Sequence, residues 1–220
     1  MRIVIADVLS RDELISARAT LARTNFVDGR ETAGFAARLV KDNRQASADD
    51  RKLETLRKLF ATRILENEVF RIAVRPKALT PLLFARYDSE MQYGTHVDDA
   101  LMQGMRTDVS FTLFLAEPEE YAGGELVIES PAGEEAIKLP AGSLVAYSST
   151  HLHRVSAVTQ GTRLVAAGWA RSFIRDQAQR ELLFELDTAR RQLFNREGKT
   201  AEFDLISKSV ANLMRMWADD

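Results

Sequence analysis

Apolar residues recur at helical spacing in two places near the start of the chain. Ser10 and Glu13 form a Ser-x-x-Glu capping box ahead of the first place, which predicts a short helix. The second place, residues 47–68, has apolar residues three or four positions apart and predicts a longer helix. A strand is expected at residues 3–5. Residues 25–34 hold turn formers and glycines and are expected to form a loop.

From residue 69 to residue 173 the pattern changes to short apolar runs separated by proline, glycine, serine or acidic residues. Runs of this kind predict strands. The predicted strands are residues 69–75, 82–87, 109–115, 125–129, 135–139, 144–147, 151–155 and 163–173. No long helical pattern separates them, so the crossover helices of a parallel sheet have no room. The predicted fold class is a mainly β core, a jelly roll or double-stranded β-helix, with helices at both ends.

Helical patterns return after Ser172. Residues 175–195 mix charged and apolar positions, residues 195–198 form a break, and a final amphipathic helix follows. Its apolar stripe must be buried somewhere. The stripe comprises Phe203, Leu205, Ile206, Val210, Leu213, Met214 and Trp217. We expect this stripe to pack within the chain, on the β core or on the N-terminal helices, and a homodimer interface is the alternative.

The length of 220 residues suits one domain with modest additions. The pattern predicts an N-terminal strand with supporting helices over residues 1–78. A β core follows over residues 79–174, and a C-terminal helical extension over residues 175–220.

Charge and composition exclude several classes of function. Thirty Lys and Arg against thirty-two Asp and Glu give a net charge of −2, which argues against nucleic acid as the main partner. The chain has no cysteine, so disulfides, zinc fingers, iron–sulfur clusters and a cysteine nucleophile are excluded. No apolar run approaches the length of a membrane span, and the N-terminus lacks the features of a signal peptide. We therefore expect a cytoplasmic protein without a membrane partner.

Histidine chemistry must draw on three residues, His96, His151 and His153. His96 and Asp98 are two positions apart, so on an extended segment their side chains project to the same face. A second imidazole would complete the facial set of two histidines and one carboxylate that holds non-haem Fe(II). His151 and His153 are also two positions apart, and strand geometry alone does not choose between them. The alternative for His96 is a surface histidine bonded to a neighbouring carboxylate.

Arg163 begins the apolar run that ends the β region. Its ordinary role would be that of a solvated residue at a strand end. At the mouth of a small barrel, however, its planar guanidinium suits bidentate binding of a carboxylate. A dicarboxylate co-substrate would need such an anchor.

An ordered series of short motifs resembles those of the Fe(II)/2-oxoglutarate-dependent dioxygenases. The resemblance is to the bacterial PKHD-type hydroxylases, which are related to prolyl and lysyl hydroxylase domains, and it covers roughly residues 80–175. The motifs are Arg86-Tyr87, Tyr93-Gly94-Thr95-His96-Val97-Asp98, Tyr121-Ala122-Gly123-Gly124-Glu125-Leu126, Leu152-His153-Arg154-Val155 and Gly161-Thr162-Arg163. Each motif is weak alone, and the series is specific.

The resemblance implies a role for particular residues. His96, Asp98 and His153 would hold the iron, and Arg163 would bind the distal carboxylate of 2-oxoglutarate. The match to Leu-His-Arg-Val and the spacing to Arg163 favour His153 over His151. The resemblance also suggests dependence on ascorbate (vitamin C).

Other residues near the motifs have both structural and functional interpretations. Tyr87 is a candidate co-substrate ligand, and so is Tyr93, although core packing explains an aromatic residue equally well. Asp99 is expected to point away from His96 into solvent. Gly123 and Gly124 are expected to form a turn. One departure is Glu90, which occupies a place where the family usually has glycine, so the loop before His96 is expected to differ in shape.

The leading hypothesis is a dioxygenase that hydroxylates a substrate while 2-oxoglutarate is converted to succinate and CO₂. The expected partners are O₂ and a small-molecule or peptidyl substrate, which the sequence does not identify. One rival is a cupin-like module that binds a metal or small ligand without turnover. A second rival is a purely structural β domain whose helices serve protein association.

Overall fold

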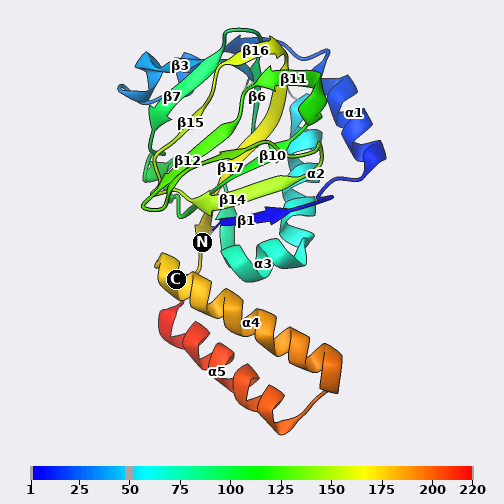
Figure 1. Cartoon of the computed structure of the whole chain (residues 1–220), viewed down its shortest axis with the longest axis vertical. Coiled ribbons are helices and arrows are strands. Elements are labelled where there is room, and N and C mark those ends of the chain that lie inside the picture. The colour runs from blue at the N-terminus through cyan, green and yellow to red at the C-terminus, as the bar shows by residue number, and fades with distance from the viewer. Residues whose placement is uncertain (1, 48–51, 220) are drawn as a thin grey trace.

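The computed structural model describes residues 2–47 and 52–219 and consists of a β core with helices at both ends (Figure 1). The helices are α1 (Arg11–Leu21), α2 (Lys52–Glu66), α3 (Glu68–Val74), α4 (Gln177–Glu197) and α5 (Ala201–Trp217), with short 3₁₀ turns η1 (Gly29–Thr32), η2 (Ala37–Leu39) and η3 (Pro118–Glu120). Residues 48–51 of the predicted helix 47–68 lie outside the described residues. In the described chain, no helix is both long and apolar enough to cross a bilayer.

An eight-stranded antiparallel sheet forms one layer of the core. Its order is β1-β14-β10-β17-β6-β4-β2, and β5 pairs with β17 beside this path. The strands are β1 (Arg2–Ile5), β14 (Leu144–Ser148), β10 (Val109–Phe114), β17 (Arg163–Ser172), β6 (Leu83–Tyr87), β4 (Arg44–Ala46), β2 (Phe26–Asp28) and β5 (Pro76–Leu79).

A five-stranded antiparallel sheet forms the opposing layer, in the order β13-β12-β15-β7-β3. Its strands are β13 (Gly133–Ile137), β12 (Leu126–Ser130), β15 (His153–Val155), β7 (Gln92–His96) and β3 (Lys41–Asp42). Two short pairs complete the core, β11 (Tyr121–Gly123) with β16 (Val158–Gly161), and β8 (Leu101–Met102) with β9 (Met105–Arg106). The expected mainly β jelly roll is confirmed.

Alternation along the strands of the larger sheet divides the core into two hydrophobic layers. On β6, Phe84 packs with the buried residues of α1, α2 and α3, whereas Ala85 and Tyr87 face the space between the sheets. On β17, Ala166 belongs to the helix-covered layer and Val165 to the layer between the sheets. Period-two alternation therefore places Arg163, two positions before Val165, between the sheets.

The strand predicted at residues 69–75 is wrong, because this segment forms α3. Asn67 caps the helix, its side chain accepting a hydrogen bond from the backbone N–H of Phe70 at 3.0 Å. Phe70, Ala73 and Val74 are buried, and their spacing of three and four positions is helical. In a run this short, a helical stripe and a fully buried strand look alike in sequence.

The loop expected at residues 25–34 is also only partly correct. Phe26–Asp28 forms β2, which pairs with β4, and Gly29–Thr32 forms η1. The partner strand lies well downstream, so local turn-forming residues gave no sign of the pairing.

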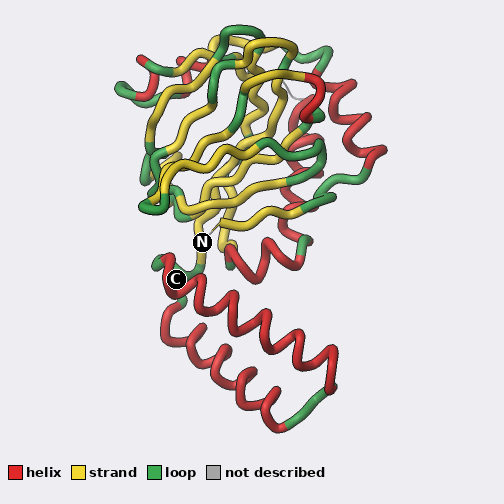
Figure 2. Tube along the Cα trace, in the orientation of Figure 1, coloured by secondary structure: helices red, strands yellow, loops and turns green. Residues whose placement is uncertain are grey.

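The C-terminal helices α4 and α5 form an antiparallel hairpin that projects from the base of the β core (Figures 1 and 2). The stripe on α5 packs against α4, not against the β core or the N-terminal helices as expected. Val210 is buried with Leu183 and Ile174, and Ile206, Leu213, Met214 and Trp217 pack around them. Leu205 is 64% exposed, so it does not share the burial of the stripe.

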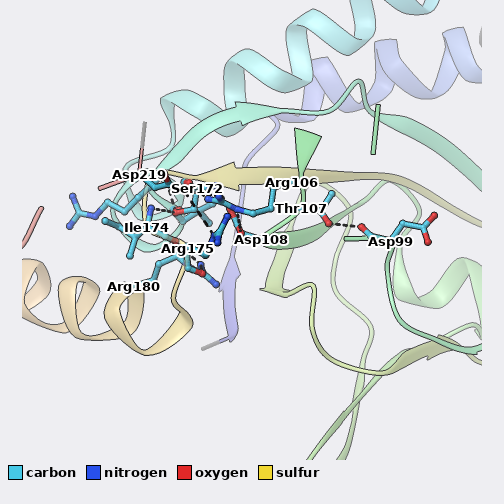
Figure 3. Close-up of polar contacts among 11 residues, drawn as sticks. Asp99, Arg106, Thr107, Asp108, Ser172, Ile174, Arg175, Arg180 and Asp219 are labelled. Atoms are coloured by element: carbon cyan, nitrogen blue, oxygen red, sulfur yellow. Dashed lines mark hydrogen bonds and ion pairs between the residues drawn. The ribbon is translucent and has the colours of Figure 1, made fainter. Parts of the chain in front are cut away.

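A polar clasp holds the end of the chain on the β core (Figure 3). The Arg106 guanidinium donates to Asp219 at 2.7 Å and to Asp108 at 2.8 Å. The Asp219 N–H donates to the Phe173 carbonyl at 2.7 Å, next to a β-bridge between Ile174 and Ala218. Asp219 is therefore held both by Arg106 of β9 and by the backbone directly after β17.

Candidate metal centre

Two histidines lie side by side on neighbouring strands. β15 pairs with β7 so that His153 is opposite His96, and their ring centroids are 4.3 Å apart. β7 ends at His96, and Asp98 follows in irregular chain. One potential ligand atom from each of these three residues lies within 4.8 Å of the others. The His153 Nε2 is 3.7 Å from the Asp98 Oδ2.

Backbone carbonyls fix the orientation of both imidazoles. The His96 Nδ1 lies 2.9 Å from the Gly94 carbonyl, and the His153 Nδ1 lies 3.1 Å from the His151 carbonyl. A carbonyl oxygen only accepts hydrogen bonds, so each Nδ1 must donate. Each Nε2 is therefore the ring nitrogen left to bind a metal ion.

The imidazole of His96 is held in its neutral form. Burial, together with the adjacent His153 ring, lowers the pKa of His96 to about 4. Tyr93 stacks on the His96 ring, with centroids 3.6 Å apart and planes 15° apart. Tyr147 meets His153 edge-on at 5.2 Å. Aromatic walls thus shield both rings, and the lowered pKa keeps His96 in the neutral state that binds metal.

Ser110 fixes the carboxylate of Asp98. Its hydroxyl donates to the Asp98 Oδ2 at 2.5 Å. The Ser149 hydroxyl is 2.8 Å from that of Ser110. Since the single proton of Ser110 points to the carboxylate, Ser149 donates to Ser110. The backbone N–H of Ser149 donates in turn to the Asp108 carbonyl at 3.2 Å.

The three side chains form a donor set that suits a divalent transition metal. Two imidazoles and one carboxylate, close together and oriented by hydrogen bonds, match the facial set of non-haem Fe(II) sites. His151 is outside this cluster and only partly buried. Asp99 is exposed, and its backbone carbonyl accepts a hydrogen bond from Thr107 at 2.6 Å (Figure 3).

Arg163 lies between the sheets opposite Tyr87 and is 1% exposed. Its guanidinium carbon is 5.0 Å from the centroid of the Tyr87 ring and 5.6 Å from that of Phe114. Its buried Nε has no hydrogen-bond partner among the described residues, and the charge of the guanidinium limits the rise that burial causes in the pKa of the neighbouring Tyr121. Among the described residues, no carboxylate oxygen lies within 4.0 Å of the guanidinium.

Gly124 makes room for the Arg163 side chain. A Cβ at position 124 would lie 3.1 Å from the Arg163 Cδ and 2.9 Å from the Val158 Cγ2. Both Gly123 and Gly124 have positive φ angles, 71° and 68°. The predicted turn is thus also a packing requirement for the arginine.

Burial raises the pKa of Tyr87, and the nearby charge of Arg163 opposes the rise. The phenol is therefore protonated at neutral pH and can donate a hydrogen bond. Glu90 has φ 71°, a left-handed conformation that favours glycine. Glu90 therefore adopts a conformation that glycine adopts more easily, and a loop shape that differs from the family's stays a prediction.

A cavity of about 500 Å³ joins the two parts of the site. The donor set and Arg163 line it, together with Tyr87 and Tyr93. Lys41 and Asn43 also line it, and sequence reasoning missed both. The available signal was the polar alternation of Lys41, Asn43 and Gln45, which is weak because the pairing of β3 with β7 is not local.

Comparisons with known proteins agree with this geometry. The model of the 2OG-Fe(II) oxygenase superfamily matches residues 82–171, and the model of the PKHD-type hydroxylase C-terminal domain matches residues 177–219. Solved structures share the fold. A Pseudomonas putida prolyl-4-hydroxylase has a TM-score of 0.52 at 22% sequence identity, and the match covers 78% of this chain and 92% of that one. A Trichoplax adhaerens prolyl hydroxylase in complex with a peptide has a TM-score of 0.55 at 16% sequence identity, and the match covers 82% of this chain and 86% of that one.

Fold, donor set and family model together define an Fe(II)/2-oxoglutarate-dependent dioxygenase. A PKHD-type hydroxylase of Picosynechococcus sp. is 53% identical over 98% of both chains, and one of Acaryochloris marina is 52% identical over 100% of both. The chain belongs to the PKHD-type hydroxylase family. The family implies Fe(II), 2-oxoglutarate, O₂ and a substrate to be oxidised.

Proposed function

We propose that this chain hydroxylates a substrate at a centre where His96, Asp98 and His153 hold Fe(II), while 2-oxoglutarate is decarboxylated to succinate and CO₂. The observation that carries the proposal is the buried Arg163. It is a cation without a carboxylate partner in the described chain, and it lines the same cavity as the donor set. A buried charge of this kind requires a compensating anion.

Arg163 would bind the distal carboxylate of 2-oxoglutarate, with its planar fork fixing the orientation of that end. Tyr87, a buried phenol beside it, would donate a further hydrogen bond. Leu126, Val155 and Val165 also line the cavity and give it an apolar wall, which would limit the access of water to the bound co-substrate. When bound, the iron supplies the redox chemistry that activates O₂.

The remaining residues position the centre. The carbonyls of Gly94 and His151 hold the imidazoles with Nε2 free, and Ser110 holds the carboxylate. We retain the division into residues 1–78, 79–174 and 175–220, which the separate family-model matches support. Ascorbate dependence and the cytoplasmic compartment stay predictions.

Anaerobic addition of Fe(II) and 2-oxoglutarate tests the proposal. Chelation of the keto acid by Fe(II) is expected to produce a visible charge-transfer absorbance, and addition of O₂ should then yield succinate. The variant His96→Ala should show neither signal, and Lys208→Met, an exposed substitution on α5, should show both. A wild-type protein that binds Fe(II) without this absorbance would support the non-catalytic binding module instead.

A further inference from the structure

A second cation lines the cavity from the sheet that opposes the one carrying the predicted co-substrate arginine. Lys41 is 7% exposed and lies on β3, the edge strand of the five-stranded sheet. It is paired with Tyr93 of β7, three residues before His96. Its ammonium group therefore enters the cavity from the strand next to the one that carries the first histidine.

The Lys41 ammonium has little compensation within the described chain. It donates to the Thr32 hydroxyl at 3.1 Å and lies 5.1 Å from the centroid of the Tyr93 ring. No carboxylate oxygen of the described residues lies within 4.0 Å of it. Burial lowers the pKa of Lys41 to about 8, and the more distant carboxylates of Asp98 and Asp28 limit the fall. Lysine is rarely buried without an anion.

Lys41 and Arg163 act on different parts of the cavity. The charge of Lys41 acts on His96, whereas that of Arg163 acts on Tyr87, Tyr121 and Tyr147. The two residues also come from opposing sheets. A co-substrate whose distal end is held by Arg163 would therefore leave Lys41 without an anion. Asp98 would not supply one, because a carboxylate that binds Fe(II) shares its charge with the metal.

Asn43, two residues after Lys41, lines the same cavity on the side of Tyr87. It is 2% exposed, and its amide lies close enough to the Tyr87 phenol to limit the rise of the pKa of that phenol. A Cβ at Gly29 would lie 1.8 Å from the Asn43 Oδ1, so the glycine makes room for this amide. Asn43 therefore accompanies Tyr87, and Lys41 remains the cation of this wall that has no anion within 4.0 Å among the described residues.

We propose that Lys41 is the subsite for an anionic oxygen group of the substrate to be hydroxylated, which makes that substrate a carboxylate-bearing molecule. This inference rests on the proposed function, since it takes Arg163 to be occupied by 2-oxoglutarate. Lys41 supplies the positive charge that the carboxylate of the substrate would compensate. The site thus distinguishes the substrate by its charge as well as by its shape.

Calorimetric titration under anaerobic conditions tests the subsite without turnover. Protein loaded with Fe(II) and saturating 2-oxoglutarate is titrated with acetate, hexanoate and benzoate, each compared with its uncharged amide. The tightest carboxylate should bind the wild type at least tenfold more tightly than its amide. Lys41→Met should remove this preference without weakening amide binding, Lys41→Arg should keep most of it, and the exposed control Lys208→Met should keep all of it. Phenyl phosphate in place of benzoate distinguishes a phosphate site from a carboxylate site.

The outcomes separate this inference from the proposed function. Equal affinity of wild type for each carboxylate and its amide, equal carboxylate affinity of wild type and Lys41→Met, or tighter binding of phenyl phosphate than of benzoate would overturn the inference. Loss of 2-oxoglutarate binding in Lys41→Met, but not in Lys208→Met, would assign Lys41 to the co-substrate and also overturn it. Failure of the wild type to bind 2-oxoglutarate would instead contradict the proposed function. The carboxylate titration, repeated on protein without Fe(II) or 2-oxoglutarate, would still decide the role of Lys41. If Lys41→Met did not fold, the preference of the wild type for a carboxylate over its amide, and the loss of that preference in Lys41→Gln, would decide the role of Lys41.

Discussion

His153 and His151 are two positions apart, yet the structure gives them different surroundings. His153 is buried with its Nε2 towards Asp98, whereas His151 lies outside the donor cluster and contributes its backbone carbonyl. Strand alternation left both open, because it places them on the same face, and only the match to Leu-His-Arg-Val with the spacing to Arg163 favoured His153. The difference arises because β15 begins only at His153, after a turn that strand periodicity did not predict.

Replacing each histidine separately tests this distinction. His153→Ala should abolish tight Fe(II) binding, because only two of the three predicted ligands, one carboxylate and one imidazole, would remain. His151→Ala should bind Fe(II) almost as the wild type does, since alanine keeps the backbone carbonyl that orients His153. Equilibrium dialysis with Fe(II) under anaerobic conditions measures both affinities. Retention of iron by His153→Ala together with its loss in His151→Ala would reverse the assignment.

Replacing Ser110 tests whether its hydrogen bond to the Asp98 carboxylate contributes to metal binding. Ser110→Ala should weaken Fe(II) binding by about 10- to 100-fold, the usual effect of removing a group that orients a metal ligand. The fold should be retained, and circular dichroism checks this. Ser130→Ala, at the exposed end of β12, serves as the matched control. Equal metal affinities of the two variants would show that Asp98 needs no such support.

The residues found from sequence and those missed differ in a physical way. His96, Asp98, His153 and Arg163 occur in short motifs that resemble those of a known family, and the resemblance implied their roles. Lys41 enters the site through the pairing of β3 with β7. Such pairing depends on contacts between distant segments, which local patterns do not encode.

At the level of elements, long periodic segments were predicted well and short ones were not. The capping box of Ser10 and Glu13 is present, and α4 and α5 lie close to their predicted ranges. The run at residues 69–75 was assigned to a strand because four to eight apolar residues fit either structure. Burial of α3 against the eight-stranded sheet decides the outcome, and this is a tertiary effect.

The clasp at the C-terminus should make part of the stability depend on pH. The Arg106 guanidinium lowers the pKa of Asp219 from its ordinary value of 3.8. A carboxyl with a lowered pKa in the folded state stabilises the protein above its unfolded pKa. This contribution is lost as the pH falls through the folded value. Asp219→Asn should therefore be less stable than the wild type near pH 7.

The difference in the free energy of unfolding between the wild type and Asp219→Asn should shrink as the pH falls below 3.8. Urea unfolding of both proteins at pH 7 and at pH 3 measures it, with Glu185→Gln at an exposed position of α4 as the control. A difference that stayed constant between the two pH values would show that the ion pair does not stabilise the clasp.

For the whole molecule, the C-terminal hairpin should contribute to stability. Deleting residues 199–220 removes α5 and exposes the face of α4 that Val210, Ile206, Leu213 and Trp217 cover. Loss of this burial should cost more than about 3 kcal/mol, which lowers the melting temperature by roughly 6–12 °C for a chain of this size. Thermal unfolding followed by circular dichroism measures the change. An unchanged melting temperature in the truncated protein would mean that the hairpin is not a stabilising element.

The overall architecture was predictable because short apolar runs without intervening helical patterns allow few alternatives to an antiparallel β core. The arrangement of that core was not predictable, since strands as short as β3 and β4 carry almost no pattern. The placement of α5 on α4, away from the β core, was likewise hidden because its stripe fits any apolar surface.

The central claim is that one buried cation and one donor set act together on 2-oxoglutarate, and a titration of Arg163→Ala tests it most directly. Loss of the partner for a buried carboxylate costs about 2–5 kcal/mol of binding, a decrease of roughly 30- to 4,000-fold in affinity. Fe(II) affinity should be nearly unchanged, because the guanidinium is not among the donors. The charge-transfer absorbance of each Fe(II)-loaded protein, followed as 2-oxoglutarate is added, gives the 2-oxoglutarate affinity of the wild type and of the variant. A large loss in the variant is the predicted result, and equal affinities would contradict the account.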